Sequence, residues 1–189
     1  TYQVTEVGLG GGADYDFGGG KFAEGETQTL WLVGHNVDGE PDPAVAVYEG
    51  DSLTVCWGVS EEDTAVETIL IYKDGGQFKI TRGAYDADLT RGNDFELAAG
   101  PVCGDLPSSK EITLPGGAPF ALRIKPLYNK QPMPLAVSGG SFPRHGDCWQ
   151  STATSQGTQT VARVQQCQPY LAPAEIFDYA LFSQGGLAK

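Results

Sequence analysis

The chain has few positive charges, few histidines and no long apolar run. Its 189 residues include 12 Lys and Arg against 24 Asp and Glu, a net charge of −12, and only two histidines. No stretch reaches the ~18–20 apolar residues of a membrane-spanning helix, and the given sequence does not open with a basic-then-apolar leader. An acidic surface repels phosphate groups. We therefore expect no nucleic-acid partner and no membrane insertion, and we interpret the chain as processed or as a fragment.

Motifs for catalysis are also missing. The sequence has no G-x-S-x-G elbow, S-x-x-K pair, P-loop or dinucleotide-binding fingerprint. His35 and His145 each lie beside turn residues, so we interpret them as loop histidines that touch solvent. The run from His145 to Asp147, with Ser141 nearby, is the kind of polar arrangement that arises by chance. We expect no catalytic residue, no metal centre and no enzymatic activity.

Calcium at the surface is the one cofactor left open. Asp14 and Asp16 lie in a glycine-rich loop that lacks the EF-hand glutamate, because Gly25 occupies that position. A second acidic group is expected to be a solvated loop; it comprises Asp86, Asp88 and Asp94. Oxygen ligands and glycine are plentiful at both places, but neither has a defined calcium-binding spacing. We expect no cofactor otherwise.

Glycine and proline are abundant, at 26 and 12 residues. Together they make about a fifth of the chain, against roughly 12% in an average protein, which excludes a helical bundle. Between turn clusters lie β-branched and aromatic segments, at residues 2–7, 27–34, 44–48, 52–57, 66–72, 77–85, 111–114, 120–127, 135–138, 148–154 and 160–166. This spacing predicts an all-β fold, an antiparallel two-sheet sandwich with many short strands. We assign residues 1–26 to a glycine-rich N-terminal strand and loop, and 27–189 to the sandwich.

One hairpin turn can be placed from the sequence. A type I′ turn needs positive φ at both central residues, which Asp74-Gly75 tolerates. That turn pairs Ile69 with Ile80, whereas a turn at Gly75-Gly76 would pair Ile69 with Arg82. We prefer the first register because it sets apolar residues opposite each other and pairs Glu67 with Arg82.

The four cysteines predict two disulfides, since none forms a C-x-x-C pair; they are Cys56, Cys103, Cys148 and Cys167. A turn centred at Gly157-Thr158 would set Cys148 opposite Cys167, while one at Gln156-Gly157 would set it opposite Gln165. We predict Cys148–Cys167, which leaves Cys56–Cys103, with two other connectivities and four free thiols as alternatives. Disulfides indicate an extracellular or cell-surface location.

The tryptophans suggest a binding hypothesis. Trp57 follows Cys56, and a tryptophan packed on a disulfide is a common core arrangement. Trp31 and Trp149 are the candidates for ligand binding, as a surface on which sugars stack, although each also lies in a strand pattern. Core packing is the expected role for at least two of the three.

The C-terminal segment is ambiguous. Residues 173–182 alternate, with Phe177, Tyr179 and Leu181 on one side, which favours a strand. Pro173 and Glu175 are helix-start signals and keep a helix open.

Several stretches together resemble a known family. They are residues 30–35 (LWLVGH), 52–57 (SLTVCW), 68–73 (TILIYK), 121–129 (ALRIKPLYN), 150–152 (QST) and 176–183 (IFDYALFS). From about Thr27 to Lys189 the chain resembles the extracellular β-domain of pilin-like, minor-pilin-type bacterial surface proteins. The resemblance implies an N-terminal prepilin helix that this sequence lacks, a non-enzymatic structural or adhesive role, and partners among other pilus or surface subunits, further copies included. It transfers no catalytic residue.

Two other functions remain open. A carbohydrate-binding module would use Trp31, Trp149 or a nearby tyrosine to bind a glycan. A hydrolase would need a cleft with two carboxylates or a histidine-supported nucleophile.

Overall fold

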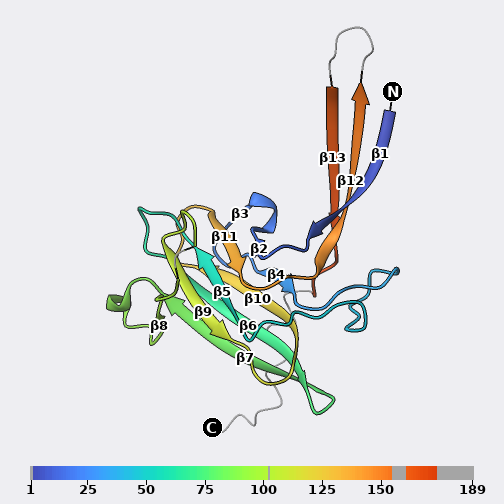
Figure 1. Ribbon diagram of the computed structural model, residues 1–189. Helices are drawn as coiled ribbons and strands as arrows, with labels where there is room; N and C mark the ends of the chain where they lie inside the picture. The colour runs from blue at the N-terminus through green and yellow to red at the C-terminus, as the bar shows by residue number, and fades with distance from the viewer. Residues whose placement is uncertain (1, 102, 155–160, 174–189) are drawn as a thin grey trace.

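The computed structural model describes residues 2–101, 103–154 and 161–173 (Figure 1). Within these residues the regular structure is almost all β, and the helical pieces are 3-10 turns at Phe17–Gly19 and Leu89–Arg91. The predicted all-β class is confirmed. The predicted strand or helix at 173–182 lies almost wholly outside the described residues.

One five-stranded sheet has the order β4-β10-β6-β7-β8. Its strands are β4 (Gln28–Trp31), β6 (Ala65–Asp74), β7 (Gln77–Asp86), β8 (Glu96–Leu97) and β10 (Ala118–Leu127). All of its pairs are antiparallel except the short β7–β8 pair, which is parallel. A predicted strand at 44–48 does not form; that segment contributes only a bridge between Val47 and Val33.

The second sheet has the order β2-β11-β5-β9, and β3 also pairs with β11. Its strands are β2 (Asp14–Tyr15), β3 (Lys21–Phe22), β5 (Ser52–Trp57), β9 (Ser108–Thr113) and β11 (Met133–Ser138). Buried and partly buried residues alternate along β11, as expected for a strand with one face against the core. The buried residues are Met133, Leu135 and Val137.

The main core lies between these two sheets. It takes apolar side chains from both, among them Leu30, Leu53, Val55, Trp57, Val66, Leu70, Leu122, Ile124, Leu135 and Val137. Two sheets that each bury one face against the other form a sandwich. The predicted antiparallel sandwich is therefore confirmed, and we call it the body.

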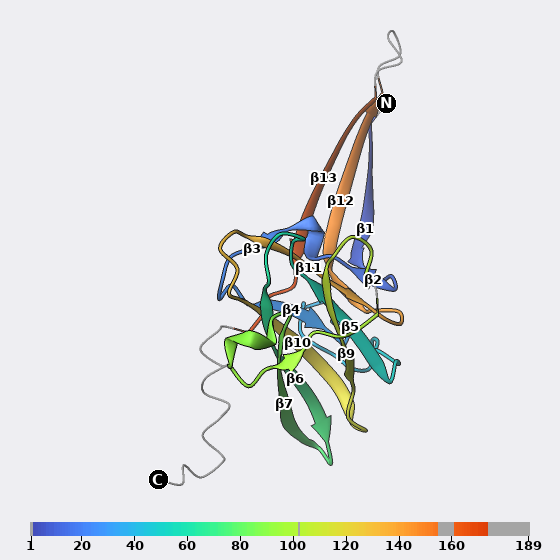
Figure 2. The same cartoon turned by 90° about the vertical axis from the view of Figure 1, so that its left-hand side faces the viewer.

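A third sheet, in the order β1-β12-β13, projects from the body as an arm (Figures 1 and 2). It consists of β1 (Tyr2–Gly10), β12 (Arg144–Thr154) and β13 (Val161–Pro169). The pairing of β1 with β12 joins the first ten residues to the C-terminal third of the chain. The sequence predicted these strands but not a separate sheet, because alternation within a strand does not reveal which sheet it joins.

The β6–β7 hairpin corrects the predicted register. Its turn is Gly75-Gly76, with φ of 58° and 83°, and Ile69 lies opposite Arg82. Two glycines accept positive φ with less strain than an aspartate and a glycine, so turn chemistry outweighs the extra apolar pairs. Arg82 still forms its ion pair, with Glu67 at 2.7 Å, because a diagonal neighbour is within its reach.

Both predicted disulfides are present. Cys148 pairs directly opposite Cys167 in the β12–β13 ladder and is bonded to it. Cys56–Cys103 joins β5 to the loop that precedes β9. The predicted turn centred at Gly157-Thr158 falls within residues 155–160, which lie outside the described residues.

Candidate binding site at the foot of the arm

The two tryptophans singled out for ligand binding lie in different environments. Trp31 is 4% exposed and packs in a small core with Val33 and Ala121. Trp149 is 44% exposed and lies on the arm. Of the two, Trp149 is the one whose side chain is open to solvent, while Trp31 borders a second cavity together with Tyr15 and His145.

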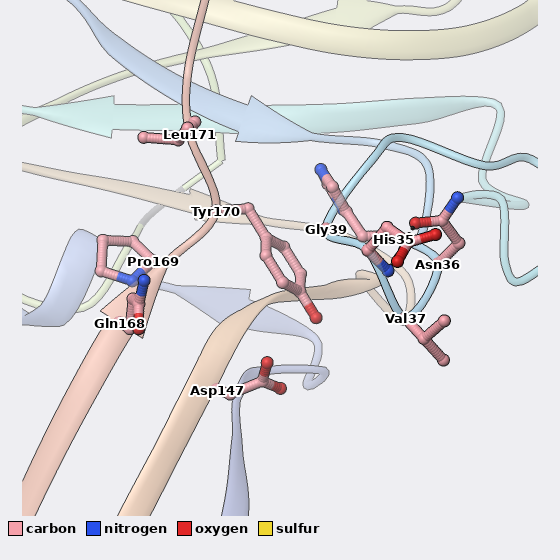
Figure 3. A pocket seen from close by; sticks show the side chains of 10 residues that line it. His35, Asn36, Val37, Gly39, Asp147, Gln168, Pro169, Tyr170 and Leu171 are labelled. Carbon is pink, nitrogen blue, oxygen red and sulfur yellow. Dashed lines mark hydrogen bonds between the residues drawn. The ribbon is translucent and has the colours of Figure 1, made fainter.

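A cavity of about 550 Å³ lies where the arm meets the body, and we call it the foot pocket (Figure 3). The loop after β4 forms one wall, the ends of β12 and β13 form the other, and the chain that follows β13 completes it. The lining residues are His35, Asn36, Val37, Asp38, Gly39, Asp147, Gln168, Pro169, Tyr170 and Leu171. Sequence reasoning did not find this site, because its walls come from segments more than a hundred residues apart.

The loop wall is held by its own hydrogen bonds. The side-chain oxygen of Asn36 accepts from the backbone N–H groups of Asp38 and Glu40, both at 3.0 Å. Gly39 has a φ of 78°, and its N–H donates to the Asn36 carbonyl at 3.0 Å. Such an Asx turn places Asp38 and Val37 on a defined wall rather than on a loose loop.

The pocket is negatively charged. Asp38 and Asp147 line it, and no Lys or Arg does so among the described residues. Neither carboxylate forms an ion pair in the described part of the chain. A ligand of this pocket is therefore neutral or cationic.

His35 forms part of the pocket wall and is buried, not solvated as predicted. Its ring stacks on Tyr170, with centroids 4.0 Å apart, and meets Trp31 edge-on at 4.9 Å. Burial lowers the pKa of His35, so the imidazole is neutral near pH 7. Both ring nitrogens lack a hydrogen-bond partner in the described residues, although buried polar groups usually have one.

His145 is also buried, which again corrects the prediction. Its Nδ1 accepts a hydrogen bond from the backbone N–H of Trp31 at 3.3 Å, and its ring stacks on Tyr15 with centroids 4.1 Å apart. Burial lowers the pKa of His145 to about 4, and the nearby His35 adds to this. These contacts link the arm to the body, because His145 belongs to β12, Tyr15 to β2 and Trp31 to β4.

A signal in the sequence pointed to the burial of His35. In the run LWLVGH the residues Trp31, Val33 and His35 alternate, so all three are placed on one side of an extended chain. Trp31 and Val33 form the small core, and His35 packs on Trp31. No comparable pattern surrounds His145.

The acidic cluster at Asp86 also differs from expectation. Asp86 is fully buried rather than solvated, and it forms an ion pair with Arg91. It accepts further hydrogen bonds from the Asn93 side chain at 2.7 Å and the Asp88 N–H at 2.9 Å. Its oxygens are thus occupied by protein donors. Among the described residues, no group of three or more His, Cys, Asp or Glu side chains is placed to hold a metal ion.

One face of the arm continues into the foot pocket. The register places Val4, Ser151 and Val164 in one cross-strand row, and Trp149 two residues along β12 from Ser151. Asp147 and Gln168 form a row nearer the body on the same face. We call this surface the Trp149 face; its apolar members are Val4, Trp149 and Val164, with exposed fractions of 49%, 44% and 66%.

No protein-family model, curated protein or solved structure matches the chain. In the described part of the structure, no helix has the length and apolar character needed to cross a bilayer.

Proposed function

We propose that this chain is a non-enzymatic, extracellular structural or adhesive domain of a pilus- or filament-associated surface protein. Its partners are other surface subunits, further copies of the chain included. The observation that carries this proposal is the arm, a three-stranded sheet whose two edge strands have no further partner strand among the described residues and whose exposed side chains include Val4, Trp149 and Val164.

The arm lacks the features that make a small sheet stable alone. Three strands need an apolar face packed against something, yet every described side chain of β13 from Ala162 to Pro169 is exposed. Val164 and Trp149 lie open on one face. A partner that covers this face or extends the sheet would supply the missing contacts.

The edges of the arm support the same function. β1 and β13 are each nine residues long, and each pairs only with β12 among the described residues. Proteins usually block such edges with charged side chains, lysine above all, or with proline. Neither strand contains lysine, each has a single charged residue (Glu6 in β1 and Arg163 in β13), and the one proline is the last residue of β13. An uncovered edge can accept a partner strand through backbone hydrogen bonds.

The disulfides support an extracellular location, because such bonds persist in oxidising compartments. One of them, Cys148–Cys167, fixes the arm near its foot. The resemblance to pilin-like surface domains points in the same direction.

Antibody labelling of intact cells that produce the protein tests the proposal. We expect label on surface filaments, and loss of filament label for Val164→Lys, since a lysine blocks a sheet edge. Val45→Lys is the matched control, because Val45 is a similarly exposed valine on the body. Label confined to the cell interior, or full filament label with Val164→Lys, would contradict the proposal.

A second candidate function is carbohydrate binding, favoured by the exposed indole of Trp149. Aromatic rings with an open face stack on sugars. Binding on a glycan array that disappears with Trp149→Ala, in a chain that still folds, would favour this function.

A further inference from the structure

We propose that the Trp149 face and the foot pocket together dock a polypeptide segment of a partner protein in which a Lys or Arg is flanked by apolar residues. This inference rests on the proposed function and names the chemistry of its partner. It draws on the charge of the pocket, on the apolar surface around it and on the incomplete hydrogen bonding of His35.

The negative charge of the pocket favours a cationic ligand. The loop from Asn36 to Pro43 has the sequence NVDGEPDP, with three acids and no base. Asp38 on this wall and Asp147 on the other wall both line the pocket. A positive side chain between them would find two carboxylates that have no ion-pair partner among the described residues.

The rim of the pocket is apolar. Val37 on the loop and Leu171 after β13 both line the cavity, and both are almost fully exposed. Lysine and arginine have long aliphatic stems that cover apolar surface while the charged head stays near polar groups. The rim therefore matches the stem, and the carboxylates match the head.

The Trp149 face extends this surface along the arm. The register carries it from Asp147 and Gln168 to Trp149 and on to Val164. Tryptophan is enriched among the residues that contribute most to protein interfaces. Apolar residues next to the basic residue of a docked segment would contact this strip.

His35 is a residue of the pocket wall whose hydrogen bonding is incomplete. It lines the cavity, is 7% exposed, and has no hydrogen-bond partner for either ring nitrogen in the described residues. A neutral imidazole has one donor and one acceptor, and leaving them unpaired in the interior is unfavourable. Both nitrogens are themselves buried, so a docked segment reaches them only if the Tyr170 ring moves off its stack.

A saccharide fits this pocket less well. Sugar stacking requires an open aromatic face, and one face of Tyr170 is already covered by His35. The indole of Trp149 does not line the pocket. Saccharide binding is therefore an outcome of the test rather than the proposal.

Binding of designed peptides to the purified full chain tests the inference. The probes are a peptide of alternating valine and threonine with a central lysine, the same peptide with glutamate in place of lysine, and the neutral oligosaccharide maltohexaose. The variants are Asp38→Asn with Asp147→Asn and, separately, Trp149→Ala. The matched control is Asp51→Asn with Asp105→Asn, which makes the same charge change at two exposed acids outside the pocket.

We expect the lysine peptide to bind, and the pocket double variant to weaken its affinity by about ten-fold, because a charge pair is lost. Trp149→Ala weakens binding as well, the control pair does not, and higher salt reduces affinity. Equal binding by the glutamate peptide, equal loss in the control pair, or maltohexaose binding in place of the peptide would overturn the inference. Circular dichroism of each variant verifies that it is folded.

The outcome separates this inference from the proposed function. If the chain is found on surface filaments but binds no lysine peptide, this inference fails and the proposed function stands. If the chain binds the peptide in the pocket but lies inside the cell, the proposed function fails and the docking surface stands.

Discussion

At the residue scale, the most informative side chains are those whose burial differs from expectation. His35, His145 and Asp86 were all predicted to be solvated, and all are buried. Asp86 is compensated by Arg91 and Asn93, whereas the ring nitrogens of His35 have no partner in the described residues. The first pattern fits a structural role, and the second is an unsatisfied buried group in the wall of the foot pocket.

The burial of His35 and His145 predicts that the folded chain is less stable in acid. Because the folded-state pKa of His145 is about 4, below its usual 6.5, the unfolded chain binds a proton that the folded chain does not. The free energy of unfolding therefore falls as the pH drops from about 6.5 to 4, by up to about 3 kcal/mol, and His145 has no further effect below that range. The lowered pKa of His35 acts in the same direction.

Urea unfolding between pH 7 and 4 measures this effect. We expect His145→Gln to be less stable than the native chain at pH 7, since a buried stacked ring is lost, but to lose less stability on acidification. Parallel pH profiles for the two chains would show that His145 does not control the acid sensitivity.

Asp86 gives a second prediction at this scale. Replacing it with alanine leaves Arg91 and Asn93 without their shared acceptor, and breaking a buried ion pair costs about 3 kcal/mol. We expect Asp86→Ala to lower the free energy of unfolding by this amount, measured by urea titration. Asp105→Ala, at an exposed acid, is the control, and a similar loss there would contradict the assignment.

At the scale of elements, the arm and the body are stabilised differently. The body has a shared apolar core, whereas the arm depends on backbone pairing and on Cys148–Cys167. Removal of this disulfide by Cys148→Ser and Cys167→Ser should therefore affect the arm first. We expect faster amide exchange in β12 and β13, with the exchange of β5 and β6 unchanged.

The other disulfide provides the matched control. Cys56 is buried in β5, so Cys56→Ser with Cys103→Ser should destabilise the body. Equal acceleration of exchange in β5 after loss of either disulfide would contradict the separation of arm and body.

Strands and disulfides were largely predictable from the sequence, and the site was not. The limits of β5 match the prediction because its apolar run is bounded by clear turns, and the Cys148–Cys167 register follows from two strands joined by a short connection. The β6–β7 register was missed because all three residues from Asp74 to Gly76 can occupy the central positions of a turn, so the sequence does not fix where the turn lies. The foot pocket was not predictable because the approach of the loop at His35 to Asp147 is a tertiary contact.

At the scale of the whole molecule, the arm is the feature on which the proposed contact role rests. A compact body carries an arm with uncovered edges, and the pocket at the junction of the two is acidic and open (Figures 1 and 3). Surface patches with exposed apolar residues generally mark sites of interaction. The central claim is that the arm is the part of the molecule that meets its partners.

Photo-crosslinking in living cells tests that claim most directly. A photoreactive residue in place of Val164, on the arm, is compared with the same residue in place of Val45, on the body. We expect the arm position to crosslink to another surface subunit, or to a second copy of the chain, in a product that external protease can reach, and we expect no such product from Val45. No product from Val164, or the same partners from both positions, would contradict the claim.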